Sequence, residues 1–458
     1  MRTAQIEQHM ANGAPPAGGA TQEARQPGEP WNYTVYALLA LGIIVIAYFQ
    51  FRAVVPRVLD VAARRHGIEL LAYMGVLWMA LSVLLIIVRT VLWILYRPSP
   101  SAAGETAPSM TVVIPAYNEG PMVLQSIESA VNADYPHDRL EVLVVDDGSK
   151  DATWSYILEA ERRHPGLVTA LHHDRNLGKR EALALGFARA RGEVLVTIDS
   201  DSVIERGALL ALAGPFRDAR VGAVAGKVLV YNLAHGVIPR MLHVRFILSF
   251  DMLRAAESVY RNVYCCPGAL TGYRARALRG VLERWKSQKF LGSRCTFGED
   301  RAMTNYLLDQ GYDSLYQRTA VVHTVVPNEY GKLCKMLLRW DRSYVREELR
   351  FARIVWKRPW PTRILSVFDR FITNARYPIS YATLGILPVV IAVHPAIVGP
   401  MLAVMGGLSL FQVLYYLRTE RSLNFIYGVL YAYFSSIALF WIFPYAVATV
   451  RARGWLTR

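Results

Sequence analysis

The chain has 458 residues, a formal net charge of +15, 53% hydrophobic residues and a mean hydropathy of +0.22. The length allows one large domain or two ordinary ones, and the apolar content is high for a soluble protein. Much of the positive charge lies on arginines beside the apolar runs. This placement is typical of membrane flanks and disfavours nucleic-acid binding, for which basic residues would be interleaved with aromatic ones.

Five apolar runs are candidates for helices that cross a hydrocarbon core, which takes roughly 20 residues. They cover residues 33–51, 70–96, 377–393, 397–417 and 423–450. The leader before them is rich in Gly, Pro, Ala and Gln and lacks the short basic start of a signal peptide, so we expect the first run to be retained.

The charges around these runs do not agree on one topology. Four arginines, at positions 52, 57, 64 and 65, lie between the first two runs. A cytosolic domain after the second run would make that loop external, against the positive-inside tendency. The basic C-terminal tail suggests a cytosolic end, which an odd number of spans forbids. We therefore expect either that residues 364–374 also enter the membrane or that the last run breaks near Pro444.

The middle of the chain has the character of a soluble α/β domain. Apolar strands are predicted at 110–116, 140–147 and 194–201, with helices at 121–133, 152–163 and 180–190. Apolar strands separated by helices predict a parallel sheet covered on both faces, whose ligands bind beyond the carboxyl ends of the strands. Polar residues gather at those ends: Tyr117, Asn118, Glu119, Asp146, Asp147, Asp199 and Asp201.

This acidic edge points to a divalent cation. The sequence has neither the glycine fingerprint for dinucleotides nor a P-loop, and carboxylates alone repel phosphate. Asp199 and Asp201 can hold a diphosphate through Mg²⁺ or Mn²⁺, although such pairs also cap turns or face water. The four cysteines show no Cys-x-x-Cys spacing, which disfavours zinc and suits a reducing cytosol.

Seven segments carry a wider pattern. They are "VVIPAYNEG" (112–120), "VVDDGSKD" (144–151), "NLGKREAL" (176–183), "DSDS" (199–202), "CCPGALTGYR" (265–274), "FGEDRAMTNYLLDQGY" (297–312) and "RWDRSYVRE" (339–347). In order and spacing the chain resembles the inverting family 2 glycosyltransferases, and among them the membrane-embedded processive synthases of hyaluronan, rhizobial chitooligosaccharides, chitin and cellulose. The flanking apolar runs and the terminal "GWLTR" are similar too.

The resemblance implies an α/β GT-A-type (Rossmann-like) glycosyltransferase domain inserted between N- and C-terminal α-helical transmembrane segments, with interfacial amphipathic helices. We therefore expect a disordered leader at 1–32, two transmembrane helices at 33–97, a linker at 98–109, a cytosolic glycosyltransferase domain at 110–330, interfacial helices at 331–376 and a C-terminal transmembrane region at 377–458.

On the donor side, the resemblance implies one group of residues for uridine, one near the nucleotide, and one for the ribose-diphosphate and its metal. Tyr117, Glu119 and Asp147 would hold the uridine, with Asp146 nearby. Lys179 would lie near the nucleotide. Asp199 and Asp201 would contact the ribose-diphosphate and the metal. Taken alone, Lys179 reads as an exposed charge at the start of a helix.

On the acceptor side, the resemblance makes Asp300 the base that takes the proton from the acceptor hydroxyl, with Glu299 and Arg301 beside it in the substrate site. Acidic residues also suit the first turn of a helix, and both roles are compatible. Cys265 and Gly268 would line the site of the acceptor terminus, although buried cysteines elsewhere are usually small core residues.

Residues 330–353 alternate basic and apolar side chains like a helix on the membrane surface. Here the resemblance implies that Arg339 meets the diphosphate and that Trp340 stacks on the acceptor sugar. An interfacial Trp is more often only an anchor. Met336 departs from the pattern, because Gln is usual four positions before the Trp, and this change bears on the donor-side contact and on processivity.

The expected function is inverting, processive transfer from UDP-sugars, with UDP-GlcNAc and UDP-GlcA the first candidates, to a growing hyaluronan-like or N-acetylglucosamine-containing β-glycan that passes through the spans. The expected partners are the donor, the glycan and the lipid bilayer, without nucleic acid, at the plasma (inner) membrane with a cytosolic catalytic domain. The alternative is a non-processive transferase that makes a glycolipid or lipid-linked sugar. A receptor without activity is disfavoured because Asp199, Asp201 and Asp300 are all present.

Overall fold

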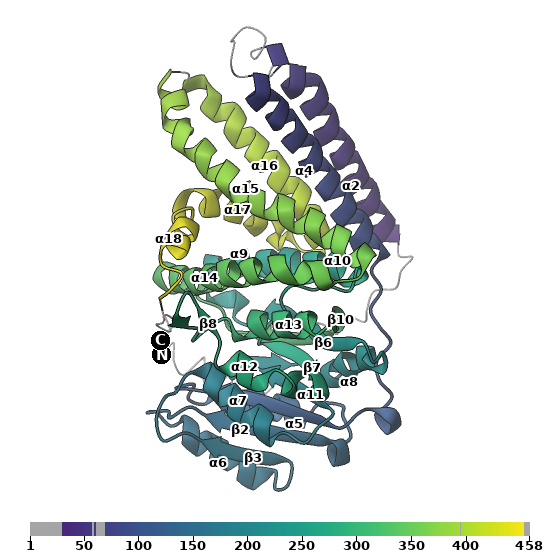
Figure 1. Cartoon of the computed structure of the whole chain (residues 1–458), viewed down its shortest axis with the longest axis vertical. Coiled ribbons are helices and arrows are strands. Elements are labelled where there is room, and N and C mark those ends of the chain that lie inside the picture. Colours follow the sequence, from purple (N-terminus) through teal and green to yellow (C-terminus); the bar gives the residue numbers. More distant parts are fainter. Residues whose placement is uncertain (1–29, 57–58, 61–68, 394, 453–458) are drawn as a thin grey trace.

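The computed structural model describes residues 30–56, 59–60, 69–393 and 395–452. The chain forms three layers (Figure 1): long apolar helices at one end, helices that lie across the middle, and an α/β domain at the other end. Most of the predicted leader, the arginines at 57, 64 and 65, and the terminal "GWLTR" lie outside the described residues. The first helix, α2, spans Pro30–Phe49 and so includes the last three leader residues.

The α/β domain is built on an eight-stranded sheet with the order β3-β2-β1-β4-β7-β6-β10-β5. The strands are β1 (Met110–Ala116), β2 (Leu140–Asp146), β3 (Val168–His172), β4 (Val194–Ile198), β5 (Ser202–Ile204), β6 (Val221–Val230), β7 (Leu270–Arg274) and β10 (Asp313–Thr324). A separate hairpin pairs β8 (Lys289–Phe290) with β9 (Ser293–Arg294).

The predicted parallel sheet is correct for one half of the domain. Strands β3, β2, β1 and β4 pair in parallel. The other half is mixed: β6 and β10 pair in parallel, but β7 runs antiparallel between β4 and β6, and β5 runs antiparallel to β10, so the prediction is wrong for β5 and β7. Antiparallel neighbours need no helical crossover, so the helix-strand alternation that signals a parallel sheet is missing there.

The apolar strands are buried because helices cover both faces of the sheet. Every residue of β1 is buried, and its side chains alternate between the faces. Val112 and Ile114 pack in one core cluster with Ile127 of α5 (Met122–Val131), whereas Val113 packs in the other cluster with Phe187 of α7 (Lys179–Arg189). The remaining helix of this half is α6 (Thr153–Arg163).

Within the described residues, four helices are long and apolar enough to cross a membrane: Pro30–Arg52, Tyr73–Leu95, Trp360–Val393 and Val398–Glu420. They correspond to α2, α4 (Glu69–Leu95), α15 (Trp360–Val393) and α16 (Val398–Glu420). A bent pair, α17 (Ile426–Ala438) and α18 (Ile442–Ala448), gives a fifth candidate with a 50° break. Residues 364–374 lie within α15, and the last run breaks between Ala438 and Ile442, just before Pro444.

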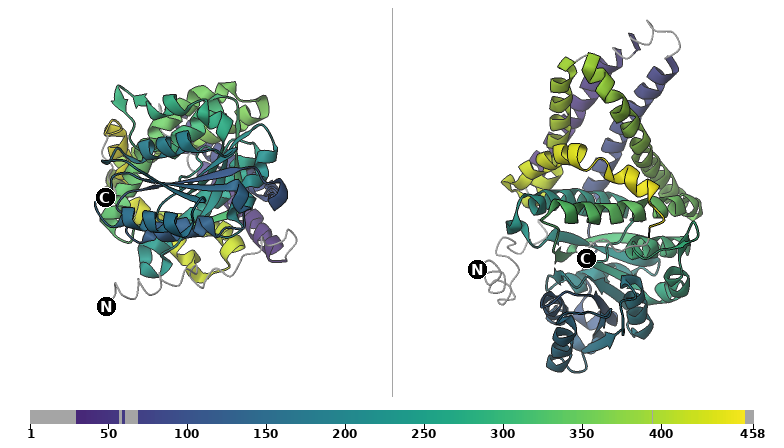
Figure 2. Two further views of the ribbon diagram at one scale, coloured as in Figure 1. Left: turned by 90° about the horizontal axis from the view of Figure 1, so that it is seen from below. Right: turned by 90° about the vertical axis from the view of Figure 1, so that its left-hand side faces the viewer.

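Between the spans and the α/β domain lies a layer of crossing helices, seen from the side in Figure 2. It contains α9 (Val237–Phe246), the π-helix η6 (Ile247–Met252), α10 (Leu253–Val259) and the 25-residue α14 (Tyr330–Ile354). Helix α13 (Glu299–Asp309) packs against α14 on the side of the sheet. This places the candidate catalytic residues of α13 directly below the layer.

Gly298, which precedes α13, tests how tightly that helix is held. Its φ is +74°, and an added Cβ would lie 2.0 Å from Ser343 Oγ on α14. We expect Gly298→Ala to lower the free energy of unfolding by about 2–5 kcal/mol, from a left-handed backbone and from overpacking. Gly166→Ala is the matched control, because φ there is +81° and nothing lies within 4 Å. Denaturant unfolding in detergent should give the control a loss of only about 1–2 kcal/mol. Equal losses would contradict the tight packing.

Candidate functional site

The carboxyl ends of β1, β2 and β4 meet at one edge of the sheet, where the acidic residues were expected. A pocket of about 410 Å³ lies there. Its lining residues come from the loops after β1, β2 and β3: Tyr117, Gly148, Ser149, Lys150, His172, Asp174, Arg175 and Asn176. Tyr117 is therefore the one predicted uridine-site residue that lines this pocket directly.

Asp146 lies buried at the base of the pocket. Its carboxylate accepts hydrogen bonds from the amide and hydroxyl of Ser149, at 3.1 and 2.5 Å, and lies 2.9 Å from Nδ1 of His172. The imidazole of His172 also packs on Trp154, with ring centroids 4.8 Å apart. These bonds hold the loop after β2 and the end of β3 together, so Asp146 shapes the pocket wall.

Asp147 forms hydrogen bonds mainly with backbone amides of the segment before α7. It is 2% exposed and accepts hydrogen bonds from the amides of Leu177 and Gly178, at 3.0 and 2.7 Å. His173 Nδ1 lies 2.8 Å from the same carboxylate. Because these residues lead into α7, the position of Lys179 depends on Asp147.

Glu119 joins the ends of β1 and β4. Ser200 Oγ donates to its Oε1 at 2.9 Å, and the Glu119 amide donates to Thr153 Oγ1 at 2.8 Å. The side chain therefore lies between the pocket at the ends of β1 and β2 and the Asp199–Asp201 segment.

Lys179, the first residue of α7, lies between two carboxylates. Its Nζ is 2.5 Å from Asp199 Oδ1 and 3.3 Å from Glu299 Oε1, which joins α7, the end of β4 and the start of α13. Burial alone would lower the pKa of Lys179, but the charges of Asp199 and Glu299 outweigh it and raise that pKa above its ordinary value. The ammonium is therefore charged at neutral pH, not an isolated surface charge.

Asp201 lies two residues further, with its Oδ1 near the hydroxyls of Ser202 (3.2 Å) and Thr324 (3.3 Å). No group of three or more His, Cys, Asp or Glu side chains able to hold a metal is present among the described residues. Asp199 and Asp201 thus offer oxygen ligands of the kind that Mg²⁺ and Mn²⁺ prefer, but too few to complete a coordination shell. They fit a cation whose other ligands come from a bound diphosphate or water.

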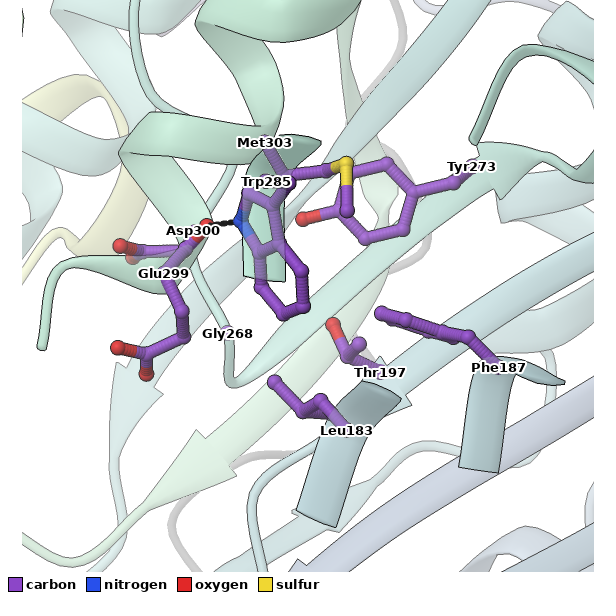
Figure 3. A pocket seen from close by; sticks show the side chains of 9 residues that line it. All are labelled: Leu183, Phe187, Thr197, Gly268, Tyr273, Trp285, Glu299, Asp300 and Met303. Atoms are coloured by element: carbon purple, nitrogen blue, oxygen red, sulfur yellow. Dashed lines mark hydrogen bonds between the residues drawn. The ribbon is translucent and has the colours of Figure 1, made fainter. Parts of the chain in front are cut away.

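Helix α13 presents the two acidic residues at its first turn. Glu299 is 6% exposed, and its carbonyl accepts a hydrogen bond from the Trp285 indole at 2.9 Å (Figure 3). Behind the carboxylates, Figure 3 shows an apolar cavity whose wall includes Leu183 and Met303. This apolar backing keeps water from Glu299, whereas Asp300 is half-buried, and the neighbours of both carboxylates shift their pKa values.

Those neighbours shift the pKa values of the two carboxyl groups in opposite directions. Burial would raise the pKa of Glu299, but the Lys179 ammonium outweighs it and holds that pKa below its usual range. For Asp300, burial and then the adjacent Glu299 charge raise the pKa above its usual value. The amide of Arg301 donates to Asp300 Oδ1 at 2.7 Å, and the Cys265 thiol lies 3.8 Å from Oδ2. Asp300 is thus both a first-turn residue of α13 and the better proton acceptor of the pair.

The other predicted residues of this region lie on two sides of α13. Gly268 borders the Lys179–Asp199 pair, because an added Cβ would lie 3.1 Å from Nζ and 3.3 Å from Asp199 Oδ1. Arg301 points the other way, toward the middle layer, with Nη1 3.8 Å from Glu348 and its guanidinium 5.2 Å from the Tyr344 ring centroid. Arg301 therefore connects α13 to α14.

On α14, Trp340 faces protein. Its ring centroid lies 6.1 Å from that of Phe246 and 6.0 Å from that of Phe250, and the Arg245 guanidinium lies 5.8 Å away. The Arg339 charge acts on both Lys179 and Glu299. Met336, where Gln is usual, is 6% exposed and belongs to the apolar core under the helix.

Sequence reasoning missed several residues that hold this site. His172 and His173, the partners of Asp146 and Asp147, follow the apolar start of β3 and could have been found by the same strand-end rule. Phe246, Phe250 and Arg245 could not, because only the folded chain brings α9 and η6 to Trp340.

Comparison with known proteins supports this arrangement. Residues 111–282 match the family model "Glycosyl transferase family 2". These residues form a family 2 glycosyltransferase domain. The chain is 34% identical over 248 residues to an N-acetylglucosaminyltransferase of Mesorhizobium japonicum, covering 54% of this chain and 58% of that protein. A hyaluronan synthase of Streptococcus pyogenes is 32% identical over 279 residues, covering 60% of this chain and 65% of that protein.

A longer but weaker match is an N-acetylglucosaminyltransferase of Rhizobium sp. (strain N33), 28% identical and covering 77% of both chains. Among solved structures, a mannosyltransferase from Pyrobaculum calidifontis in complex with GDP-Man and Mn²⁺ has a TM-score of 0.56 at 22% identity, covering 79% of this chain and 98% of that one. At this identity the match shows the fold alone. The GT-A-type fold and the resemblance to rhizobial N-acetylglucosaminyltransferases and to hyaluronan synthases are confirmed.

Proposed function

We propose that the protein is a membrane-embedded, inverting transferase that moves sugar units from a UDP-sugar onto a growing β-glycan. The observation that supports this most is the convergence at one place of Asp199, the Lys179 ammonium and Asp300, directly below the layer that holds Trp340. A donor diphosphate, a base and an acceptor platform are what an inverting transfer requires.

The donor would bind along the acidic edge. The pocket beside Tyr117 has a volume typical of small-ligand sites and would take the nucleoside, with Asp146 and Asp147 holding its walls. Asp199 and Asp201 would hold Mg²⁺ or Mn²⁺ together with the diphosphate, and the cation would stabilise the charge on the leaving group. Arg339 would add positive charge near the same group.

The reaction would run through Asp300. The acceptor oxygen forms a bond to the anomeric carbon while the bond from that carbon to the diphosphate oxygen breaks, and UDP leaves with the electron pair. The acceptor proton passes to the Asp300 carboxylate. Glu299 stays ionised beside Lys179 and keeps the proton affinity of its neighbour high.

The acceptor would enter from the membrane side. Trp340 lies in an aromatic group with Phe246 and Phe250 and is suited to stack on a sugar, while Cys265 and Gly268 border the reacting end. The names of the relatives favour N-acetylglucosamine or glucuronic acid as the transferred sugar. The candidate spans support a multi-pass protein of the plasma (inner) membrane, with the domain in the cytosol and the product passing outward.

The assay that tests this proposal uses the full chain purified in detergent. It is incubated with UDP-GlcNAc, with UDP-GlcA and with both, in Mg²⁺ or Mn²⁺, and products are sized and digested with linkage-specific hydrolases. We expect a β-linked polymer and no turnover in excess EDTA. Products of one or two sugars on a lipid would favour the non-processive alternative. Binding of UDP without any transfer would favour a receptor.

Asp300→Asn should cut transfer by about 10² to 10⁴-fold, because it keeps the shape and an oxygen that can accept from the Arg301 amide but removes the proton-accepting charge. UDP binding should be unchanged. In the wild type, kcat/KM should fall as the pH drops through the raised pKa of Asp300, because protonation removes the base. The variant's residual activity should lack this fall. Activity within a few-fold of wild type would move the base elsewhere, with Glu299 next.

Trp340→Ala should lower polymer yield and length more than it lowers hydrolysis of the donor, because it removes the acceptor platform. Trp360→Ala is the control for an interfacial anchor, since that side chain starts α15 and is 68% exposed. Product sizing of both variants separates the roles. Equal and small effects would make Trp340 a packing residue only.

A further inference from the structure

One cation is already present where the donor's metal would bind. The Lys179 ammonium lies 2.5 Å from Asp199 Oδ1, a predicted metal ligand, and 3.3 Å from Glu299 Oε1. We propose that Lys179 takes the place of the divalent cation at Asp199 while no donor is bound, and moves onto the donor diphosphate when metal and nucleotide enter together. This inference rests on the proposed function and adds an order of binding to it.

The contact leaves little room for a metal alone. A divalent ion binds carboxylate oxygens at about 2.0–2.2 Å, so at Asp199 it would lie next to the ammonium, and like charges repel at that distance. Among the described residues no third acidic, His or Cys side chain completes a metal site that could offset this repulsion. A bound diphosphate changes the balance, because it supplies oxygen ligands to the metal and a new anionic partner to Lys179.

The lysine has both the freedom and the space to move. It is the first residue of α7, follows Gly178 with φ +98°, and its side chain is 20% exposed. The absence of a side chain at Gly268 makes room for the ammonium beside Asp199, since a Cβ there would lie 3.1 Å from Nζ and 3.3 Å from Asp199 Oδ1. Its neighbour Arg180 is fixed by hydrogen bonds to the Trp285 carbonyl (2.6 Å) and to Gln288 (2.9 Å).

Glu299 keeps positive charge nearby when Lys179 leaves. The charges of Arg339 and Arg180 both act on its carboxylate and favour its ionised form. The difference between the pKa values of Glu299 and Asp300 therefore does not depend on Lys179 alone. The base can work while Lys179 is bound to the donor.

The test measures Mn²⁺ binding to the full chain in detergent by electron paramagnetic resonance, first without nucleotide and then with UDP. Wild type should bind Mn²⁺ alone weakly and bind it with UDP strongly. Lys179→Met should bind Mn²⁺ alone at least tenfold more tightly and bind UDP with Mn²⁺ at least tenfold more weakly. Lys289→Met, which removes an exposed charge on β8, is the control for net charge and should change neither.

Two more variants keep the test decisive. Lys179→Arg keeps the charge, so Mn²⁺ alone should still bind weakly. Lys179→Gln removes the charge as Lys179→Met does but can still donate a hydrogen bond to Asp199, so the same changes are expected; it carries the test if Lys179→Met does not fold. Unchanged metal-only binding in a folded Lys179→Met would overturn the inference. Failure of wild type to bind UDP even with Mn²⁺ would instead overturn the proposed function.

Discussion

The site depends on how the chain tolerates several carboxylates at one edge of a buried sheet. Like charges in a low-dielectric setting repel strongly, so each group needs a partner of its own. Asp146 has Ser149 and His172, and Asp147 has two backbone amides and His173. Lys179 serves both Asp199 and Glu299. These different partners make chemically similar residues behave differently.

The clearest case is the pair at the start of α13. Glu299, which is buried, and Asp300, which is half-buried, are adjacent in sequence, yet their pKa values shift in opposite directions. Lys179 stabilises the charge of Glu299, and that charge then opposes a second one on Asp300. Two neighbouring titratable groups whose pKa values are shifted in opposite directions are typical of an acid-base site. Lys179 thus influences the proposed base in two ways: its own charge lowers the pKa of Asp300, and by keeping Glu299 ionised it helps to raise that pKa.

Sequence alone predicted the half of the domain that obeys simple rules. Strands β1, β2 and β4 are apolar runs that end in acidic residues, so both the strands and the edge could be read directly. Strand β7 could not, because it is short, contains Gly272 and pairs antiparallel on both sides. The backbone partners of the carboxylates were also beyond prediction from the sequence. Whether Asp147 meets a ligand or the amide of Gly178 depends on loop geometry, to which residue type gives no guide.

For the candidate spans and the helices beside them, too, the sequence predicted the elements but not their contacts. Apolar length located the candidate spans, and amphipathic spacing located α14. The predicted span over 377–393 already contains Pro378 and Pro388, but the sequence did not show that the same helix, α15, begins at Trp360. Nor could the sequence tell whether Trp340 faces lipid or protein, because α14 lies between the spans and the α/β domain and buries residues on both sides.

The same layer links α13 to the spans through charge. Arg301 lies 3.8 Å from Glu348 of α14, which lies 3.2 Å from Arg370 of α15. The preceding residue, Asp369, lies 2.7 Å from Arg89 of α4. Poorly solvated charges cannot lose their partners cheaply, so these ion pairs hold α4, α14 and α15 in register with α13. The position of Asp300 at the start of α13 is therefore tied to the candidate spans α4 and α15.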